Sequence, residues 1–265
     1  MNRLAANGIH LAYELDVRAG PQAPLIVLSN SLGTHLGMWQ PQLDALARHR
    51  RVLRYDTRGH GASDLGPSPE TIADLGRDVV GLIDALGVAR VDFCGLSMGG
   101  LIGQWLGVHA ADRIERLVLC NTAAKIGTDL VWNARIAGVL GEGIQSITEA
   151  VLERWFTAGF RARAPEAVAA VREGLLATPA AGYAAACTAI RDADLRGDIA
   201  TIRAPTLIVA GTHDPATTPA DGAFLAAQIR GARYVELDCA HLSNIEAADA
   251  FNAAVLDFLL ENGHG

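Results

Sequence analysis

The sequence predicts an α/β fold in which a mostly parallel central sheet carries helices on both faces and a helical cap is inserted between sheet strands. Short apolar segments of strand length alternate with longer segments whose apolar residues recur every three to four positions. The alternation stops once, between about residues 123 and 200, where alanine-rich helical segments follow one another. A Gly-x-Ser-x-Gly pattern at Gly95–Gly99 lies where an apolar strand turns into a helix.

The size and composition of the chain limit its possible functions. Half of its 265 residues are hydrophobic, which is enough for one large α/β domain with a sizeable core. The formal net charge of −7 argues against a nucleic acid or an anionic membrane surface as partner. No apolar run reaches the roughly 18 residues of a membrane span, and Met1–His10 lacks the apolar core of a signal peptide. We therefore expect a cytoplasmic protein.

The cysteines favour a reducing compartment and give no sign of a metal site. They are widely spaced and contain no C-x-x-C pair, which predicts free thiols and neither a disulfide framework nor bound zinc. Two of them fall in predicted apolar strands, where a buried, unreactive thiol is expected. The four are Cys94, Cys120, Cys187 and Cys239.

The predicted sheet begins with an antiparallel pair, because Asn7-Gly8 separates two extended segments within Leu4–Leu11. The later strands are short apolar runs, and three helices are indicated by the elbow turn or by apolar residues that share one face. The strands are expected at 24–29, 52–55, 91–94, 117–120, 206–210 and 232–237, and the helices at 71–86, 98–108 and 246–260.

The break in the alternation predicts the domain organisation. Residues 1–122 and 201–265 form the α/β core, and residues 123–200 form a helical cap inserted between two strands of the sheet. Nothing between them has the composition of a flexible linker.

The stretch Gly95-Leu96-Ser97-Met98-Gly99 has the features of a nucleophile elbow. Glycines two residues before and after the serine are needed because a Cβ there would collide with the neighbouring strand or helix. The helix that follows directs its free N–H groups toward the serine. Taken alone, the pattern also fits a glycine-rich turn that merely exposes a serine, so the catalytic partners must decide.

A serine hydroxyl needs a histidine to take its proton and an acid to orient that histidine. Asp214 follows the predicted strand 206–210, and His241 follows the predicted strand 232–237. We therefore predict a catalytic triad of Ser97, Asp214 and His241. Asp238 remains an alternative acid, and His213 an alternative base.

An oxyanion hole requires two backbone donors. One should be the N–H of Met98, directly after the nucleophile, and the other should come from the loop after the strand at 24–29. The N–H of Leu32 is the best placed in that loop.

At this point the chain resembles the α/β-hydrolase superfamily over nearly its full length. More narrowly, it is similar to the 3-oxoadipate enol-lactonases, in which Ser-Asn-Ser-Leu-Gly and Thr-Pro-Ala-Ala-Gly-Tyr are the specific phrases. The segments that carry the resemblance are 28–33, 38–39, 56–63, 95–100, 176–183 and 239–244. Many α/β-hydrolases have His-Gly where this chain has Asn30-Ser31, and we expect this to change the hydrogen bonds of the loop more than its chemistry.

The resemblance implies hydrolysis of 3-oxoadipate enol-lactone to 3-oxoadipate, in bacterial breakdown of protocatechuate or catechol, without a cofactor or metal. The lactone, a small molecule, would be the only partner implied, and a homo-oligomer remains open. A broad carboxylesterase, a C–C bond hydrolase of the same fold and a ligand-binding receptor on a hydrolase scaffold are the alternatives.

Such a substrate carries a free carboxylate, which the cap should meet with a cation or polar donors. The candidates in the cap are two arginines and two aromatic residues, the latter serving as an apolar wall or a hydrogen-bond donor. They are Arg135, Arg191, Trp132 and Tyr183.

Overall fold

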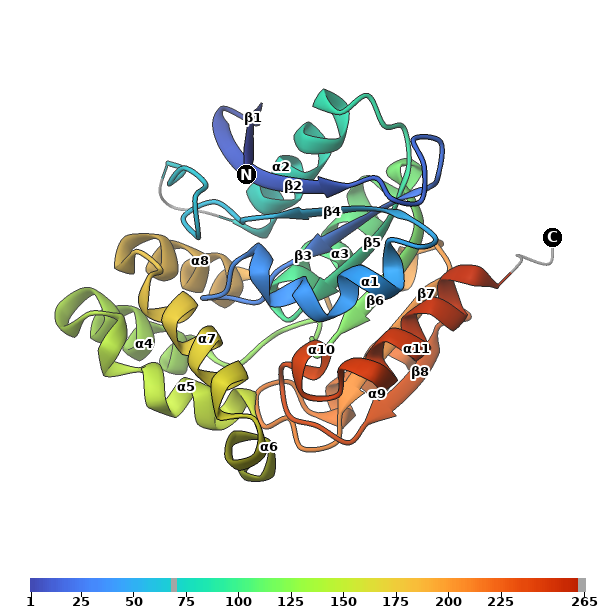
Figure 1. Cartoon of the computed structure of the whole chain (residues 1–265). Helices are drawn as coiled ribbons and strands as arrows, with labels where there is room; N and C mark the ends of the chain where they lie inside the picture. The colour runs from blue at the N-terminus through green and yellow to red at the C-terminus, as the bar shows by residue number, and fades with distance from the viewer. Residues whose placement is uncertain (68–70, 262–265) are drawn as a thin grey trace.

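An eight-stranded sheet runs through the described part of the protein, a computed structural model that describes residues 1–67 and 71–261 (Figure 1). The strand order is β1-β2-β4-β3-β5-β6-β7-β8, with antiparallel pairing only for β1 with β2 and β2 with β4. The mostly parallel α/β sheet that the sequence predicts is therefore confirmed. The strands are β1 (Asn2–Ala6), β2 (Ile9–Asp16), β3 (Leu25–Ser29), β4 (Arg51–Tyr55), β5 (Val91–Leu96), β6 (Ile114–Cys120), β7 (Thr206–Gly211) and β8 (Arg233–Leu237).

The hairpin between β1 and β2 forms at the predicted Asn-Gly pair. Asn7 has φ 47° and Gly8 has φ 81°, the two positive values that a two-residue hairpin turn of this hand needs. Because β2 then pairs antiparallel with β4, the hairpin joins the parallel strands at one edge of the sheet.

Helices cover both faces of the central strands, which explains why those strands are continuous apolar runs. All residues of β3, β5 and β7 are buried. α2 and α3 pack together on one face, and α1 and α11 on the other (Figure 1). The helices of the core are α1 (Leu43–Leu46), α2 (Ile72–Ala85), α3 (Met98–His109), α9 (Pro219–Gln228), α10 (Ser243–Glu246) and α11 (Ala248–Leu260), with 3-10 turns η1 (Leu36–Gln42), η2 (Ala111–Arg113) and η4 (Ile199–Thr201).

The helix expected at 246–260 is divided into α10 and α11. Ala247 has φ −121° and ψ 44°, which interrupts the helix between them. The side chain of Asn244 bonds α10 to the Met38 carbonyl of η1, and that of Glu246 bonds it to the Thr157 N–H. The apolar spacing of the sequence does not report this break, because the side chains that α10 buries are polar, whereas those that α11 buries are apolar.

Between β6 and β7, which are neighbours in the sheet, residues 121–205 form helices and no strand. α4 packs against α8, and α5 against α7, and the group lies beside one end of the sheet (Figure 1). These helices are α4 (Asp129–Glu142), α5 (Thr148–Trp155), α6 (Ala158–Arg163), α7 (Pro165–Leu176) and α8 (Ala180–Asp192), with the 3-10 turn η3 (Ile144–Ser146).

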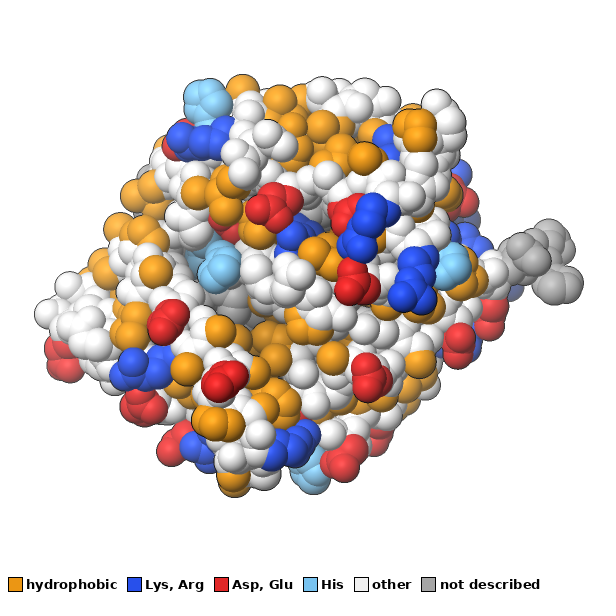
Figure 2. Space-filling model, viewed as in Figure 1, with side chains coloured by type: hydrophobic (Ala, Val, Ile, Leu, Met, Phe, Trp, Pro, Cys, Tyr) orange, Lys and Arg blue, Asp and Glu red, His pale blue; other side chains and the backbone are white. Residues whose placement is uncertain are grey.

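Acidic and basic side chains are interspersed on the surface shown in Figure 2. Many of them form exposed ion pairs, such as Arg18 with Asp44 at 2.8 Å. Such pairs contribute little to stability because water screens them. No helix in residues 1–67 or 71–261 has the length and hydrophobicity to span a bilayer.

Candidate active site

Ser97 lies on a tight turn between β5 and α3. Its φ of 59° and ψ of −110° are unusual for a residue with a side chain. A Cβ on Gly95 would lie 2.0 Å from the Gly99 carbonyl oxygen, and one on Gly99 would lie 2.2 Å from the Ser29 carbonyl oxygen. Only glycine fits at either position, as the elbow pattern requires.

Hydrogen bonds fix the elbow to the end of β6. The Ser97 N–H donates to the Cys120 carbonyl at 2.9 Å, and the Thr122 hydroxyl donates to the Ser97 carbonyl at 2.8 Å. The Gly99 N–H donates to the Asn30 carbonyl at 3.1 Å. The strained backbone is thus held by the strands on both sides of β5.

Asp214 follows β7 and His241 follows β8, and their side chains meet. The His241 Nδ1 lies 2.7 Å from the Asp214 Oδ2, and both residues are buried. An ionised carboxylate can only accept, so Nδ1 carries the proton and Nε2 keeps its lone pair. His241 and Ser97 line the same cavity. The structure therefore brings the three predicted triad residues to one place.

The Asp214 carboxylate accepts several further hydrogen bonds. Burial by itself acts to raise the pKa of Asp214, but the charge and hydrogen bond of His241, together with the other donors, outweigh it and hold the pKa below its usual range. The acid therefore stays ionised at neutral pH. Its other donors are Asn121 Nδ2 at 3.0 Å and Thr217 Oγ1 at 2.8 Å on Oδ2, and the N–H groups of Ala216 at 2.8 Å and Thr217 at 3.1 Å on Oδ1.

The alternative acid and base lie elsewhere. Asp238 and His213 pair with each other, with the His213 Nε2 2.9 Å from the Asp238 Oδ1, and both side chains are largely exposed. Neither residue lines the cavity that holds Ser97.

The two predicted oxyanion donors lie in the loop after β3 and at the start of α3. Met98 is the first residue of α3, so its N–H has no partner inside the helix. Leu32 lines the cavity together with Ser97. The Leu32 N–H donates to no other group among the described residues. Both donors are therefore available to a developing negative charge.

Side-chain hydrogen bonds brace the loop after β3. The Asn30 amide donates to the Tyr55 carbonyl at 2.8 Å and accepts from the Trp39 indole at 2.9 Å. The Gly33 N–H donates to His60 Nε2 at 3.0 Å, and burial lowers the pKa of His60, which keeps the ring neutral and able to accept. Asn30 thus joins this loop to β4 and η1.

The cavity above Ser97 has a volume of about 190 Å³ and lies between the core and the helices that follow β6. Trp132, Arg135 and Tyr183 line it, as predicted. Burial raises the pKa of Tyr183, so its hydroxyl stays protonated. Arg191 does not line the cavity: its guanidinium bonds Asp192 at 2.7 Å and Asn133 at 2.7 Å.

Arg154 also lines the cavity, and the sequence analysis did not select it. Burial, followed by the positive charge of Arg135, lowers its pKa. Neither Arg135 nor Arg154 forms an ion pair with a carboxylate of the described chain; Arg135 instead stacks over the Trp132 ring, 5.1 Å from its centroid. Two unneutralised guanidinium groups therefore share one cavity with Ser97, an arrangement suited to an anionic ligand.

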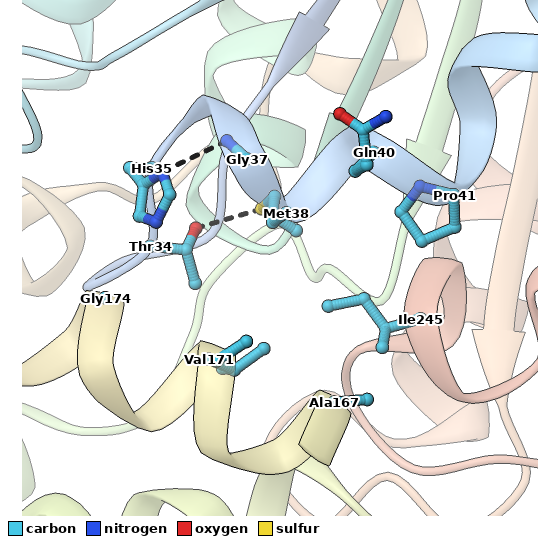
Figure 3. Close-up of a pocket in the computed structure, with 11 residues that line it drawn as sticks. Thr34, His35, Gly37, Met38, Gln40, Pro41, Ala167, Val171, Gly174 and Ile245 are labelled. Atoms are coloured by element: carbon cyan, nitrogen blue, oxygen red, sulfur yellow. Dashed lines mark hydrogen bonds between the residues drawn. The ribbon is translucent and has the colours of Figure 1, made fainter. Parts of the chain in front are cut away.

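A second cavity, of about 210 Å³, lies between η1 and α7 (Figure 3). Its lining is mostly apolar, and its polar groups are largely engaged within the chain: His35 accepts from the Gly37 N–H at 3.1 Å, and the Thr34 hydroxyl donates to the Met38 sulfur at 2.9 Å. The cavity shares no lining residue with the one that holds Ser97.

Comparison with known proteins agrees with this geometry. The model of the alpha/beta hydrolase family matches residues 21–254. The chain belongs to the alpha/beta hydrolase family. This hydrolase is 44% identical to 3-oxoadipate enol-lactonase 2 of Acinetobacter baylyi over 252 residues, covering 95% of this chain and 94% of the relative. It is 45% identical to 3-oxoadipate enol-lactonase 1 of the same organism over 233 residues, covering 88% and 87%.

The solved structures agree. The crystal structure of the enol-lactonase from Burkholderia xenovorans LB400 superposes with a TM-score of 0.97 at 53% identity, covering 98% of this hydrolase and 100% of that chain. The resemblance to enol-lactonases that the sequence motifs indicate is therefore confirmed, and this hydrolase is an enzyme.

Proposed function

We propose that this hydrolase opens the ring of 3-oxoadipate enol-lactone to give 3-oxoadipate, in bacterial degradation of aromatic compounds through protocatechuate or catechol. The observation that carries the proposal is the cavity that Ser97 and His241 line together with two guanidinium groups, neither of which forms an ion pair with a carboxylate of residues 1–67 or 71–261. A lactone is an internal ester, and this lactone carries a free carboxylate as well. The relatives named enol-lactonases support the same substrate.

The chemistry begins with attack of the Ser97 hydroxyl oxygen on the lactone carbonyl carbon while His241 Nε2 takes the hydroxyl proton. The carbonyl oxygen becomes negatively charged and accepts from the Leu32 and Met98 N–H groups. Asp214, held ionised by its surroundings, stabilises the imidazolium that has formed.

Collapse of the tetrahedral intermediate breaks the bond between the carbonyl carbon and the ring oxygen. The imidazolium gives its proton to the departing enolate oxygen, and the enol becomes a ketone by tautomerisation. Water then attacks the acyl-enzyme, with His241 taking one of its protons and returning it to Ser97. The product leaves as a dicarboxylate, with both of its carboxylates in a cavity that also holds Arg135 and Arg154.

A steady-state assay on the enol-lactone tests the proposal, with Ser97→Ala as the matched control. We expect rapid ring opening by the wild type, and loss of at least about 10³-fold in kcat for Ser97→Ala, since removal of a triad member leaves only the oxyanion hole and binding. Hydrolysis of p-nitrophenyl acetate alone would instead support a broad esterase, and ligand binding without turnover would support a receptor.

A further inference from the structure

Asn121 is the first residue after β6, and its side chain lies between the loop that carries Asp214 and the loop that carries His241. Its Nδ2 donates to the Asp214 Oδ2 at 3.0 Å and to the Ala240 carbonyl at 3.2 Å. Its Oδ1 accepts from the Ser243 hydroxyl at 2.5 Å. The side chain is buried and does not line the cavity, so it cannot contact the substrate directly.

The backbone directs the Asn121 amide to this place. Its φ of 44° is in the left-handed region, which asparagine tolerates better than most residues. Its N–H donates to the Val209 carbonyl at 2.7 Å, which ties the turn to β7. A Cβ on Gly211 would lie 2.3 Å from the Ala240 carbonyl oxygen and 3.0 Å from the Asn121 Nδ2, so a glycine there leaves room for both groups.

The other donors to Asp214 lie in its own turn. Thr217 and Ala216 bond the carboxylate from that turn, and the Thr217 hydroxyl oxygen also lies 3.4 Å from the His241 Nδ1. Asn121 belongs to a different element and bonds both Asp214 and the residue directly before His241. Together with the His213 N–H, which donates to the Cys239 carbonyl at 3.0 Å, the Asn121 amide therefore links the acid loop to the base loop.

We propose that Asn121 is a positioning residue that holds the Asp214 carboxylate in register with the His241 loop, so that His241 presents Nε2 to Ser97. The inference rests on the proposed triad and does not depend on which ester is hydrolysed. Asn121 acts through Asp214 and His241, and takes no part in bond making itself.

Asn121→Asp provides the sharpest test, because it keeps the side-chain shape and the tolerance for a left-handed backbone. It keeps an acceptor for Ser243, but it replaces the NH₂ donor with a charged oxygen facing Asp214. We expect kcat to fall by about 10- to 100-fold while KM changes less than threefold, since misplacement of catalytic groups by about 1 Å costs this much. The acid limb of the pH–kcat profile should also move to higher pH, because added negative charge favours the protonated state of the acid–base pair.

We assign the acid limb of the pH–kcat profile to Asp214 and His241 as a pair. Around Asp214 these groups are His241, the Cys239 thiol and, farther off, Asp238 and Glu246. Burial, followed by these negative charges, raises the pKa of Cys239 to about 12, outside the range of the assay.

Asn121→Gly is the companion variant, because glycine adopts the left-handed backbone without strain and removes the whole side chain without adding a charge. We expect a similar fall in kcat without the shift of the acid limb, since no charge is added. If neither variant folds, Ser243→Ala is the third variant. It keeps Asn121 but removes the hydrogen bond to its Oδ1, and it should lower kcat several-fold.

An unchanged kcat in whichever of these variants fold would overturn the proposal. So would a fall in kcat for Asn121→Asp with an unshifted acid limb, which would assign Asn121 to loop stability alone. All variants are measured on p-nitrophenyl acetate and on the enol-lactone. Failure of the enol-lactone as a substrate therefore leaves the Asn121 test intact, whereas full activity in Ser97→Ala would remove the triad itself.

Discussion

Ser97 shows how a single residue can hold a strained backbone. A positive φ on a residue with a side chain costs about 1–3 kcal/mol and persists only when the surroundings enforce it. Here the hydrogen bonds from Ser97 N–H to Cys120 and from Thr122 to the Ser97 carbonyl enforce it. The strained turn places the hydroxyl and the first free N–H of α3 at the same point.

The two arginines of the cavity lead to a prediction about substrate binding. If the proposed substrate binds in this cavity, replacing Arg154 or Arg135 by alanine removes a charged donor to its carboxylate. A charge-assisted hydrogen bond contributes about 1.5–3 kcal/mol, so KM for the enol-lactone should rise about 10- to 100-fold with a smaller change in kcat. Steady-state kinetics measures both constants.

Arg191→Ala is the matched control for this pair. It removes the same side chain from α8, where the guanidinium already bonds Asp192 and Asn133 outside the cavity. We expect its KM to stay within about twofold of the wild type, in line with the small effects of surface substitutions. Unchanged KM for both Arg135→Ala and Arg154→Ala would contradict carboxylate binding by these groups.

At the scale of single residues, the sequence predicts the candidate site residues that follow strands more reliably than those that lie on helices. Ser97 comes directly after β5, and Asp214 and His241 lie in the loops after β7 and β8. Parallel strands bring their carboxyl ends to one edge. Arg154 and Arg191 are on helices, where the spacing of apolar residues does not determine which side meets the cavity. Arg154 resembles a solvated side chain in the sequence, and only the packing of α5 shows that it is half-buried.

Among the elements, the helices after β6 are joined to the histidine loop by a buried carboxylate. Glu246 of α10 accepts from the Ala240 N–H at 3.0 Å and from the Thr157 N–H at 3.2 Å, and it also accepts from the Thr157 hydroxyl. The Leu242 N–H donates to the Trp155 carbonyl at 3.1 Å. The end of α5 and the start of α6 are thereby fixed to the residues on both sides of His241.

Thr157 provides a prediction for this connection. Its hydroxyl bonds Glu246 and also caps α6 by accepting from the Phe160 N–H. Thr157→Val keeps the shape but removes both bonds, and should lower the free energy of unfolding by about 1–3 kcal/mol. Urea unfolding followed by circular dichroism measures the change.

Thr157→Ser is the control, because it keeps the hydroxyl and loses only a methyl group. Its unfolding free energy should stay within about 1 kcal/mol of the wild type. Equal stability of the valine and serine variants would show that the connection through Glu246 contributes nothing.

For the whole molecule, the low pKa of Asp214 links stability to pH. Its pKa in the folded state lies below the value of about 3.9 for an unfolded chain, so its contribution is fully present above that pH. It is lost as the pH falls through the folded-state value. We expect the difference in unfolding free energy between the wild type and Asp214→Asn to narrow as the pH falls below about 4.

Urea titrations of both proteins across this range measure the difference. A gap that stays constant down to pH 3 would contradict a lowered pKa for Asp214. Asp44→Asn is a control, because this carboxylate is largely exposed and pairs only with an exposed arginine. Its effect should be small at every pH.

The alternation of strands and helices was sufficient to predict the α/β fold and the run of helices after β6. The alternation does not predict the order of the strands in the sheet. β4 lies between β2 and β3, and such pairings join residues that are distant in the sequence. The hydrogen bonds from Asn121 to two loops could not be predicted for the same reason, because its partners are distant in the sequence. The position of a polar residue at the end of β6 was the one indication in the sequence.

The inserted helices leave and rejoin the sheet at neighbouring strands, where Cys120 of β6 pairs with Val209 of β7. An insertion at such a point leaves every strand pairing intact, so its length and sequence can change without redesign of the scaffold. The residues that this insertion contributes to the cavity, Trp132 and Arg135 among them, can therefore differ without moving Ser97 or His241, which follow strands of the sheet.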